Sequence, residues 1–317
     1  MAAALALSGR GRGRTAPNPC VGCVIVKDGK AIGRGWTQPG GRPHAEAMAL
    51  AEAGSAARGA TVYTTLEPCA HVSPRGPACT NLLFEAGVAR VVIALGDPDP
   101  RTDGRGASAL AAAGIDVIED AAVPEARRAM AGFLTRLALG RPFVTLKLAT
   151  SLDGRIATAS GESRWITGPQ ARAHAHLERA RHEAILVGRG TLDADSPRLD
   201  VRLPGLEGRS PRRILLSASG EAPSDWTRIA SPEAITSLEA VDHLLVEGGA
   251  RTASAFLAAD LVDRLLLYRA PILIGDGPSA IQDIGLGALA EAHGRWRRLD
   301  ERMLGSDRLE VYERHRS

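Results

Sequence analysis

Four residues in the first quarter of the chain have the types and spacing of a catalytic zinc site: His44, Glu46, Cys69 and Cys79. One imidazole and two thiolates give Zn²⁺ three protein ligands and leave the fourth tetrahedral position to water. Zinc lowers the pKa of that water to about 7, so it supplies hydroxide at neutral pH. Glu46 is placed to carry a proton from this water to a leaving amine without binding the metal, as hydrolytic deamination of a pyrimidine requires.

Two other interpretations of the same residues are open. His44 can cap a helix while the cysteines pack in the core as small apolar side chains. A structural zinc site would need a fourth protein ligand, and Cys20 and Cys23 offer two more thiols. Cys23 lies inside an apolar, strand-like run, where cysteine usually packs, so we do not count this pair as ligands. Glu46 favours a catalytic site, because a structural zinc has no use for it.

The second half of the chain carries weaker signals of a phosphate-bearing ligand. Gly248-Gly249, between an expected strand and an expected helix, can place backbone N–H groups at a phosphate, although such a pair is also an ordinary tight turn. Arg179, Arg198 and Arg202 can clamp a substrate phosphate, although arginine is more often a solvated surface group. No Gly-x-Gly-x-x-Gly follows a strand, so we expect no classical dinucleotide-binding fold.

The elements that must position these residues alternate between strands and helices. In the first half we expect strands over 21–26, 31–36, 61–65, 90–95 and 115–118, and helices over 44–57, 80–86, 106–113 and 124–139. In the second half we expect strands over 143–148, 183–187, 214–216, 243–246, 265–268 and 309–312, helices over 169–181 and 249–257, and a loop over 193–212. This rhythm predicts buried sheets with helices on both faces. Because Gly140-Arg141-Pro142 breaks the chain, we expect two α/β domains, 1–140 and 141–317.

Length and composition exclude several classes of protein. A chain of 317 residues suits two domains, and 44% hydrophobic residues are enough to bury real cores. The net charge of +3 is spread evenly, which argues against nucleic-acid or membrane partners. No apolar run approaches the roughly 18 residues of a membrane-spanning helix, and the first residues make a poor signal peptide. Four cysteines are too few for a disulfide scaffold, so we expect a cytoplasmic protein.

The first half resembles the deaminase half of bifunctional riboflavin-biosynthesis deaminase/reductases, within the cytidine-deaminase-like superfamily. The resemblance rests on Pro17-Asn18-Pro19, Val21-Gly22-Cys23-Val24, His44-Ala45-Glu46, Thr65-Leu66-Glu67-Pro68-Cys69 and His71. It implies that His44, Cys69 and Cys79 bind zinc, that Glu46 is the proton shuttle and that Asn18 holds the base. Relatives that edit nucleic acids carry Pro-Cys-x-x-Cys instead. Nine residues separate the two cysteines here, where the family usually has eight, and we expect the loop Val72–Ala78 to absorb the extra one.

The second half resembles the reductase half of the same enzymes, a dihydrofolate-reductase-like fold. The resemblance rests on Lys147-Leu148-Ala149, Ser151–Arg155, Gly161–Thr167, Gly190-Thr191, Asp195–Leu199 and Val246–Gly249. It implies that NADPH faces Ala149, Trp165, Thr191, Asp195, Gly249, Ala250, Arg251, Thr252, Ala253, Ser254 and Ala255. It implies that the ribosyl phosphate faces Ser163, Arg179, Leu199, Arg202 and Glu247, with Asp195 as a catalytic residue.

Two departures from the reductase pattern lie near the expected cofactor. The segment between Ile214–Leu216 and His243 is short for the family. Ser217-Ala218 stands at a strand end that commonly carries Asp.

The two resemblances imply a cytidine-deaminase-like α/β/α domain followed by a dihydrofolate-reductase-like α/β domain. The enzyme they imply deaminates a diaminopyrimidinone ribosyl phosphate with zinc and then reduces the ribosyl group to ribityl with NADPH. We expect a homo-oligomer that acts on this small molecule and binds neither nucleic acid nor membrane.

Three rival functions remain at this point. The second half can be an inactive reductase that only scaffolds the deaminase. A zinc-stabilised nucleotide-binding protein is disfavoured by Glu46, and a nucleic-acid deaminase by the even charge and the cysteine spacing.

Overall fold

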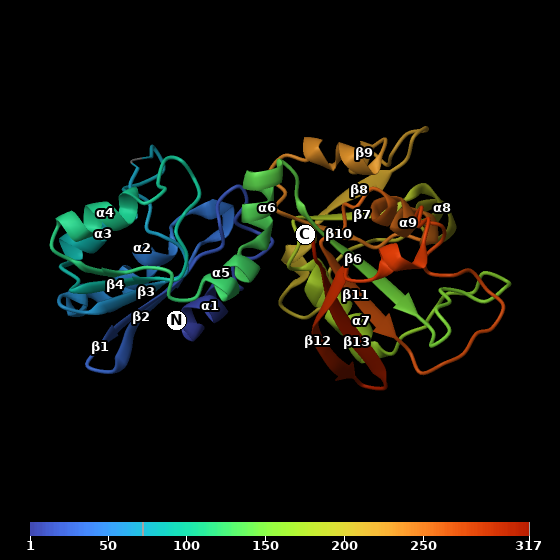
Figure 1. Cartoon of the computed structure of the whole chain (residues 1–317), viewed down its shortest axis with the longest axis horizontal. Coiled ribbons are helices and arrows are strands. Elements are labelled where there is room, and N and C mark those ends of the chain that lie inside the picture. The colour runs from blue at the N-terminus through green and yellow to red at the C-terminus, as the bar shows by residue number, and fades with distance from the viewer. Residues whose placement is uncertain (72, 317) are drawn as a thin grey trace. The chain divides into compact units, whose positions relative to one another are not determined.

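The chain divides into two compact units, Met1–Gly140 and Arg141–Ser317, in a computed structural model that describes residues 1–71 and 73–316 (Figure 1). Within those residues, no helix has both the length and the apolar character needed to cross a bilayer.

The first unit is a five-stranded sheet between two layers of helices, in the strand order β2-β1-β3-β4-β5. Strand β1 is antiparallel to β2 and β3, whereas β3, β4 and β5 are parallel. The strands are β1 (Gly22–Lys27), β2 (Lys30–Trp36), β3 (Thr61–Thr64), β4 (Arg90–Ile93) and β5 (Asp116–Ile118). The helices are α1 (Ala2–Ser8), α2 (Ala45–Ala53), α3 (Cys79–Ala86), α4 (Arg105–Ala112), α5 (Val123–Ala129) and α6 (Ala131–Leu139).

Glycines in β1 and β2 let helices approach both faces of this sheet closely. A Cβ at Gly35 of β2 would lie 2.0 Å from the carbonyl oxygen of Ala45 in α2, and one at Gly22 of β1 would lie 1.9 Å from that of Ala4 in α1. The contacts put α1 and α2 on opposite faces, because Gly22 and Gly35 point to opposite sides of the sheet. Helix α2 is thereby fixed against the sheet, and it carries Glu46 and follows His44.

Two features of the first unit differ from the sequence expectation. The single helix expected over 124–139 is two helices, α5 and α6, which meet at the fully buried Met130 with φ −109° and ψ 21°. Helix α1 was not expected, and its Ala4 and Ser8 are buried. In both places long-range packing, which a short sequence window does not contain, decides the local structure.

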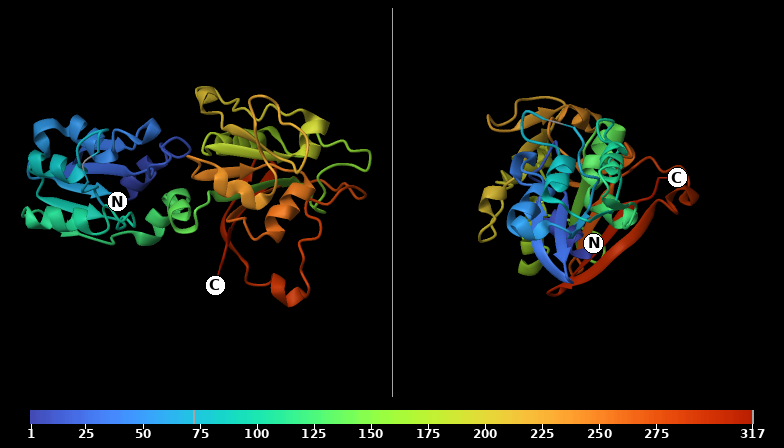
Figure 2. Two further views of the ribbon diagram at one scale, coloured as in Figure 1. Left: turned by 90° about the horizontal axis from the view of Figure 1, so that it is seen from above. Right: turned by 90° about the vertical axis from the view of Figure 1, so that its left-hand side faces the viewer.

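The second unit is built on an eight-stranded sheet in the order β12-β13-β11-β6-β10-β7-β8-β9. Figure 2 shows its ribbon in two further views, in the colours from light green to red. Only β13 is antiparallel to its neighbours, and the other pairs are parallel. The strands are β6 (Phe143–Thr150), β7 (Ala184–Gly188), β8 (Arg212–Leu216), β9 (Thr227–Ile229), β10 (His243–Val246), β11 (Arg264–Arg269), β12 (Trp296–Leu304) and β13 (Asp307–Arg314). The helices are α7 (Pro169–Arg179), α8 (Arg189–Asp195) and α9 (Ala250–Ala258).

Helices cover both faces of the central strands of this sheet. Ala253 and Phe256 of α9 belong to the core that contains Leu146 of β6. Ala171 of α7 packs on the other face with Tyr268 of β11. Three elements were not expected from the sequence: α8, β9 and β12. Strand β12 is a mostly exposed edge strand held by its backbone pairing with β13, so it needs no alternating apolar pattern.

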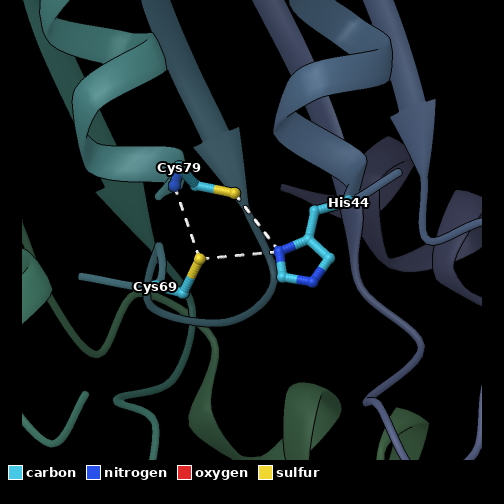
Figure 3. A group of neighbouring side chains, drawn as sticks. All are labelled: His44, Cys69 and Cys79. Carbon is cyan, nitrogen blue, oxygen red and sulfur yellow. Dashed lines mark hydrogen bonds between the residues drawn. The ribbon is translucent and has the colours of Figure 1, made fainter. Parts of the chain in front are cut away.

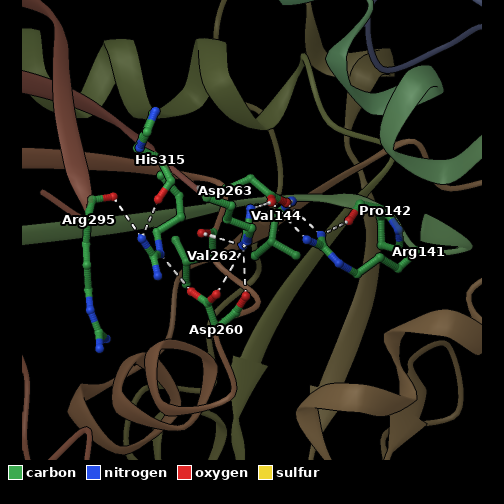
Figure 4. Close-up of polar contacts among 10 residues, drawn as sticks. Arg141, Pro142, Val144, Asp260, Val262, Asp263, Arg295 and His315 are labelled. Atoms are coloured by element: carbon green, nitrogen blue, oxygen red, sulfur yellow. Dashed lines mark hydrogen bonds and ion pairs between the residues drawn. The ribbon is translucent and has the colours of Figure 1, made fainter. Parts of the chain in front are cut away.

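A buried ion pair fixes the start of β6 against the start of β11 (Figure 4). The carboxylate of Asp263 accepts two hydrogen bonds from Arg141, at 2.7 and 2.9 Å, and one from the backbone N–H of Val144 at 2.8 Å. Arg316 donates a fourth at 2.6 Å. Removing one partner of such a pair typically costs about 3–5 kcal/mol, because the other charge stays buried. This pair therefore holds β6, which carries Lys147 and Ala149, in register with β11.

Candidate functional site

The three expected zinc ligands come from three separate segments of the chain, and their side chains point toward one another (Figure 3). His44 immediately precedes α2 in an extended conformation and makes no capping hydrogen bond with its side chain. Cys79 is the first residue of α3, and Cys69 lies in the loop after β3. The imidazole of His44 does not cap the helix but points toward the two cysteines.

The distances between the donor atoms fit a tetrahedral zinc ion. His44 Nδ1 lies 3.4 Å from Cys79 Sγ and 3.6 Å from Cys69 Sγ, and all three donors lie within 4.8 Å of one another. With bonds of about 2.3 Å to sulfur and 2.0–2.1 Å to nitrogen, a tetrahedral ion holds N and S about 3.5 Å apart. Cys20 and Cys23 lie outside this group among the residues that the structure describes.

Hydrogen bonding favours the thiolate form of Cys69, which is the form that binds metal. Bonds to Cys79 and His44 lower the pKa of Cys69 to about 4, against the opposing effect of burial. The backbone N–H of Cys79 also donates to Cys69 Sγ at 3.4 Å.

The loop Val72–Ala78 separates the two cysteines. Val72 lies outside the described residues, and Ser73 and Gly76 close a tight turn whose 3.0 Å bond runs from the N–H of Gly76 to the carbonyl of Ser73.

Glu46 lies beside the donor triangle and is 3% exposed. One carboxylate oxygen accepts from the Thr64 hydroxyl at 3.2 Å and the other lies 3.3 Å from Cys79 Sγ. Burial raises the pKa of this carboxyl group, which suits a residue that must accept a proton and release it again.

Asn18 contacts the face of His44 that points away from the cysteines. Its amide nitrogen Nδ2 lies 3.3 Å from His44 Nε2. When Nδ1 binds a metal, the ring proton is on Nε2, and a half-turn of the Asn18 amide would then let its oxygen accept that proton and direct its NH₂ away from the ring. Gly41 packs so closely that a Cβ there would lie 2.5 Å from the Asn18 side chain. Arg136 of α6 donates to the neighbouring Pro17 carbonyl at 2.6 Å and so supports the same loop.

A cavity of about 380 Å³ opens over His44, Glu46 and Cys69. Its wall contains charged residues that the sequence analysis missed, because they come from separate segments: Arg42, Arg75, Asp97, Asp99, Arg101 and Arg136. Burial raises the pKa of Asp97 to about 6.

Glu67, in the same motif as Cys69, ties the segment 97–107 to this cavity. Its carboxylate accepts four backbone hydrogen bonds, from Asp97 at 3.1 Å, Gly104 at 3.0 Å, Gly106 at 2.7 Å and Ala107 at 3.0 Å. Gly106 is required here, since a Cβ would lie 2.1 Å from the Pro68 carbonyl oxygen. Glu67 therefore positions the wall that carries Asp97 and Asp99.

In the second unit, two expected substrate residues form one ion pair. Arg179 of α7 donates two hydrogen bonds to Glu247, at 2.7 and 2.8 Å, and Lys147 Nζ lies 3.7 Å from the same carboxylate. Burial opposes the charge of Glu247, but Lys147 and Arg179 outweigh it and lower the pKa of Glu247 to about 2. The sequence motif contains Lys147 but gives it no role. Its distance to Glu247 in the structure shows that it helps to keep this carboxylate charged.

The segment that follows Leu199 is hydrogen-bonded to Arg179 of this ion pair. Arg179 donates to the Asp200 carbonyl at 3.0 Å, and His176 Nδ1 lies 3.1 Å from the same oxygen. Arg202 lies 3.4 Å from His176 Nε2. Leu199 is buried beneath the segment. The structure thus gathers Arg179, Glu247, Leu199 and Arg202.

Two of the expected cofactor residues, Thr191 and Gly249, meet at the ends of β7 and β10. The Thr191 hydroxyl accepts from the backbone N–H of Gly249 at 3.1 Å. Farther along α9, Ala253 packs in the core and Ser254 accepts from the N–H of Gln282 at 2.7 Å. Those two side chains therefore face the interior, while Arg251 is exposed.

Asp195 ends α8 and contacts the loop that carries Ser163 and Trp165. Arg164 Nη2 lies 3.2 Å from the Asp195 carboxylate. Trp165 is 64% exposed, with the Arg172 guanidinium 4.8 Å from its ring centroid. Ala149 is half-buried near the end of β6, on the face covered by α7.

Comparisons with known proteins cover both units. Residues 1–95 match the family described as cytidine and deoxycytidylate deaminase zinc-binding region, and residues 142–304 match the RibD C-terminal domain. The riboflavin biosynthesis protein RibD of Escherichia coli is 42% identical over 340 residues, covering 92% of each chain. That of Aquifex aeolicus is 37% identical, covering 99% of this chain and 98% of the relative.

Solved structures agree with these sequence relatives. A deaminase/reductase from Thermotoga maritima superposes with a TM-score of 0.87 at 33% identity, covering 98% of this chain and 97% of that one. Acinetobacter baumannii RibD superposes with a TM-score of 0.86 at 36% identity, covering 99% and 97%. These matches confirm the expected fold class, a deaminase-like domain followed by a reductase-like domain.

Proposed function

Since the chain belongs to the RibD family of riboflavin-biosynthesis deaminase/reductases, we propose which of its residues carry out each of the two reactions. The protein is a bifunctional enzyme that uses zinc for deamination and NADPH for reduction. We assign deamination to residues 1–140 and reduction to residues 141–317. The observation that carries the first assignment is the His44–Cys69–Cys79 triangle, with the buried Glu46 beside it at the floor of the cavity.

In the deaminase unit, each residue role follows from its position around the cavity. His44, Cys69 and Cys79 would hold zinc, which when bound supplies a water of lowered pKa. Glu46 would take a proton from that water as the water oxygen bonds to the ring carbon, and would deliver a proton to the ring amine, so that the carbon–nitrogen bond breaks and ammonia leaves. The Asn18 amide oxygen orients His44, and its NH₂ donates to the pyrimidine base. Arg42 and Arg75 line the same cavity and supply positive charge for the ribosyl phosphate.

In the reductase unit, the charged groups hold the substrate while the cofactor supplies hydride. Glu247 is held by its ion pairs with Arg179 and Lys147, and these charged side chains hydrogen-bond the sugar of the substrate. Ser163, Leu199 and Arg202 contact the substrate beside them. Ala149, Trp165, Thr191, Asp195 and the segment Gly249–Ala255 form the NADPH side, except that the side chains of Ala253 and Ser254 face the interior and support the helix rather than the cofactor. Asp195 orients a ribose hydroxyl or stabilises the positive charge that develops at the carbon receiving hydride.

One assay of the purified protein tests both activities. With the diaminopyrimidinone ribosyl phosphate alone, we expect release of ammonia. With NADPH added, we expect its absorbance to fall as the deaminated product is reduced. Ammonia release without NADPH consumption would favour the scaffold interpretation of the second unit, and absence of both would refute the assignment.

We also propose a cytoplasmic homo-oligomer that acts on a small-molecule substrate and needs no nucleic acid or membrane. Family membership supports the oligomer. The four free cysteines, two of them in the candidate zinc site, support a reducing compartment. Light scattering on the purified protein measures the oligomeric state, and a monomer at all concentrations would contradict it.

Replacing Asp195 is expected to separate the two activities. Asp195→Asn should lower the kcat of reduction at least about tenfold, corresponding to roughly 1.4 kcal/mol, because the amide cannot stabilise positive charge. Zinc content and ammonia release should not change. The matched control is Asp283→Asn, a loop carboxylate that accepts a local hydrogen bond from Gly285 at 2.8 Å. Equally small effects of both substitutions on the reduction rate would remove Asp195 from the active site.

A further inference from the structure

We propose that Asp153 is a positioning residue of the reduction reaction, because its carboxylate fastens the segment 270–282 beside the carboxyl end of β6. This inference rests on the proposed reductase function and deepens it. Asp153 belongs to the motif Ser151–Arg155 and is neither a substrate nor a cofactor residue in the proposed function.

The reduction takes place at the carboxyl ends of β6 and β10. Lys147 lies in the second half of β6 and Glu247 directly follows β10, and together with Arg179 they hold the sugar in the proposed reductase. The sugar carbon that receives hydride is therefore at these strand ends, and the cofactor ring has to be held against it there. Small displacements of reacting groups slow a reaction strongly, so the rate depends on how firmly the surrounding surface is fixed.

The segment 270–282 follows β11 and links it to elements on both sides of this position. At its start, the N–H of Ala270 donates to the carbonyl of Thr150, the last residue of β6, at 2.8 Å. At its far end, the N–H of Gln282 donates to the Ser254 hydroxyl of α9 at 2.7 Å. Because β6 lies between β11 and β10, and α9 follows β10, the segment is attached on both sides of the end of β6.

Asp153 fastens the middle of this segment to the turn after β6. Its carboxylate accepts from the N–H of Ile274 at 3.2 Å and from that of Gly275 at 2.8 Å. The hydroxyl of Ser151, a fully buried residue, donates to the same carboxylate at 2.6 Å and holds it in this orientation. The hydrogen bonds from Ser151 and Gly275 lower the pKa of Asp153 to about 2, so the carboxylate stays charged at neutral pH.

The rest of the turn after β6 is attached to the same segment. The guanidinium of Arg155 donates to the Gly277 carbonyl at 3.0 Å and to the Ser279 hydroxyl at 2.8 Å. The N–H of Leu152 donates to the Ile272 carbonyl at 2.8 Å. The turn and the segment lie together beyond the ends of β6 and β11 (Figure 1). Asp153 is at the centre of these contacts, so losing its hydrogen bonds frees the middle of the segment.

Apolar side chains are exposed on the surface that Asp153 fastens. Leu273 is 74% exposed, and Leu152 and Ile272 are exposed as well. Ligand sites are lined mainly by apolar side chains, which hold a ring and exclude water from the reacting atoms. These three residues therefore provide an apolar wall next to the end of β6, and Asp153 keeps that wall in place.

Kinetics, calorimetry and hydrogen exchange of the full-length protein test this inference. Asp153→Asn removes one acceptor oxygen and turns an NH₂ group toward backbone N–H groups. We expect kcat per NADP⁺-binding site to fall about tenfold or more, while calorimetry still finds about one NADP⁺ site per chain. In the protein without ligands, hydrogen exchange within 270–282 should become faster, and ammonia release by the deaminase should not change.

A carboxylate in the same loop provides the matched control. Asp283 accepts a local hydrogen bond from the N–H of Gly285, so Asp283→Asn should leave kcat per site within about twofold. Arg155→Gln loosens the same segment from a second residue and should lower kcat per site in the same direction as Asp153→Asn. If Asp153→Asn does not fold, Arg155→Gln decides the question by the same criteria.

The outcomes separate this inference from the proposed function. If Asp153→Asn lowers the number of NADP⁺ sites but not kcat per site, Asp153 only stabilises the fold and the inference is wrong. Faster exchange within 270–282 with an unchanged kcat per site would also refute it, because the loosened segment would then have no part in the reaction. If the unmodified protein consumes no NADPH, the proposed reductase function itself fails.

Discussion

Glu46→Gln is expected to lower the turnover of deamination by about 10²–10⁴ while zinc content and reduction stay at their original levels. The substitution keeps the shape of a side chain that is 3% exposed and still accepts from Thr64, but it removes the group that carries the proton. The measurement is ammonia release at saturating substrate, with zinc determined on the same preparation and reduction assayed on supplied deaminated substrate.

A second glutamate on the same helix provides the matched control for Glu46. Glu52 of α2 is exposed and pairs with Arg34 at 3.0 Å, so Glu52→Gln should leave deamination within about twofold. An equal loss of reduction in Glu46→Gln would mean that the two activities are not carried by separate units. Unchanged deamination would remove Glu46 from the mechanism.

Cys69→Ser is expected to remove most of the zinc and, with it, deamination. The unmodified protein should hold about one zinc per chain, because three donors and one open position describe a single catalytic site. Cys69 contributes the thiolate whose pKa is lowered to about 4, and a serine hydroxyl does not ionise near neutral pH. Metal analysis after dialysis measures the loss, and reduction should be unaffected.

Another buried cysteine separates loss of a ligand from loss of packing. Cys20 is 5% exposed and its Sγ lies 3.4 Å from the Ala129 carbonyl oxygen, outside the donor group. Cys20→Ser should therefore retain zinc. Full zinc occupancy in both Cys69→Ser and His44→Ala would refute the ligand assignment.

Much of the chemistry was predictable because it depends on residue type and on short spacings. His44 and Glu46 are two residues apart at the start of a helix, and Cys69 and Cys79 lie on either side of one loop. The four side chains therefore come together once α2 and α3 pack on the sheet. The two-unit division lies at the Gly140-Arg141 break expected from the sequence, although the assignment of one activity to each unit stays a prediction. The riboflavin-pathway enzyme itself came from family resemblance, which the comparisons confirm.

Other features depend on contacts between segments far apart in the chain, which no local pattern encodes. The break at Met130 follows from burial of that side chain, and the edge strand β12 from backbone pairing with β13. Lys147 stands 100 residues from Glu247, and only the parallel pairing of β6 with β10 brings them to 3.7 Å.

The surfaces of both sites were likewise decided by tertiary structure. The cavity wall joins arginines from the segment before α2, from the cysteine loop and from α6. The sequence shows Ser217 as a departure from the family pattern, but it does not show the hydrogen bonds that Arg189 and Arg228 make with it, because these depend on the adjacency of β7, β8 and β9. Residue types along the chain determine which chemistry is possible, and long-range packing decides which charges surround it, since solvation and electrostatic energies depend on distance in space.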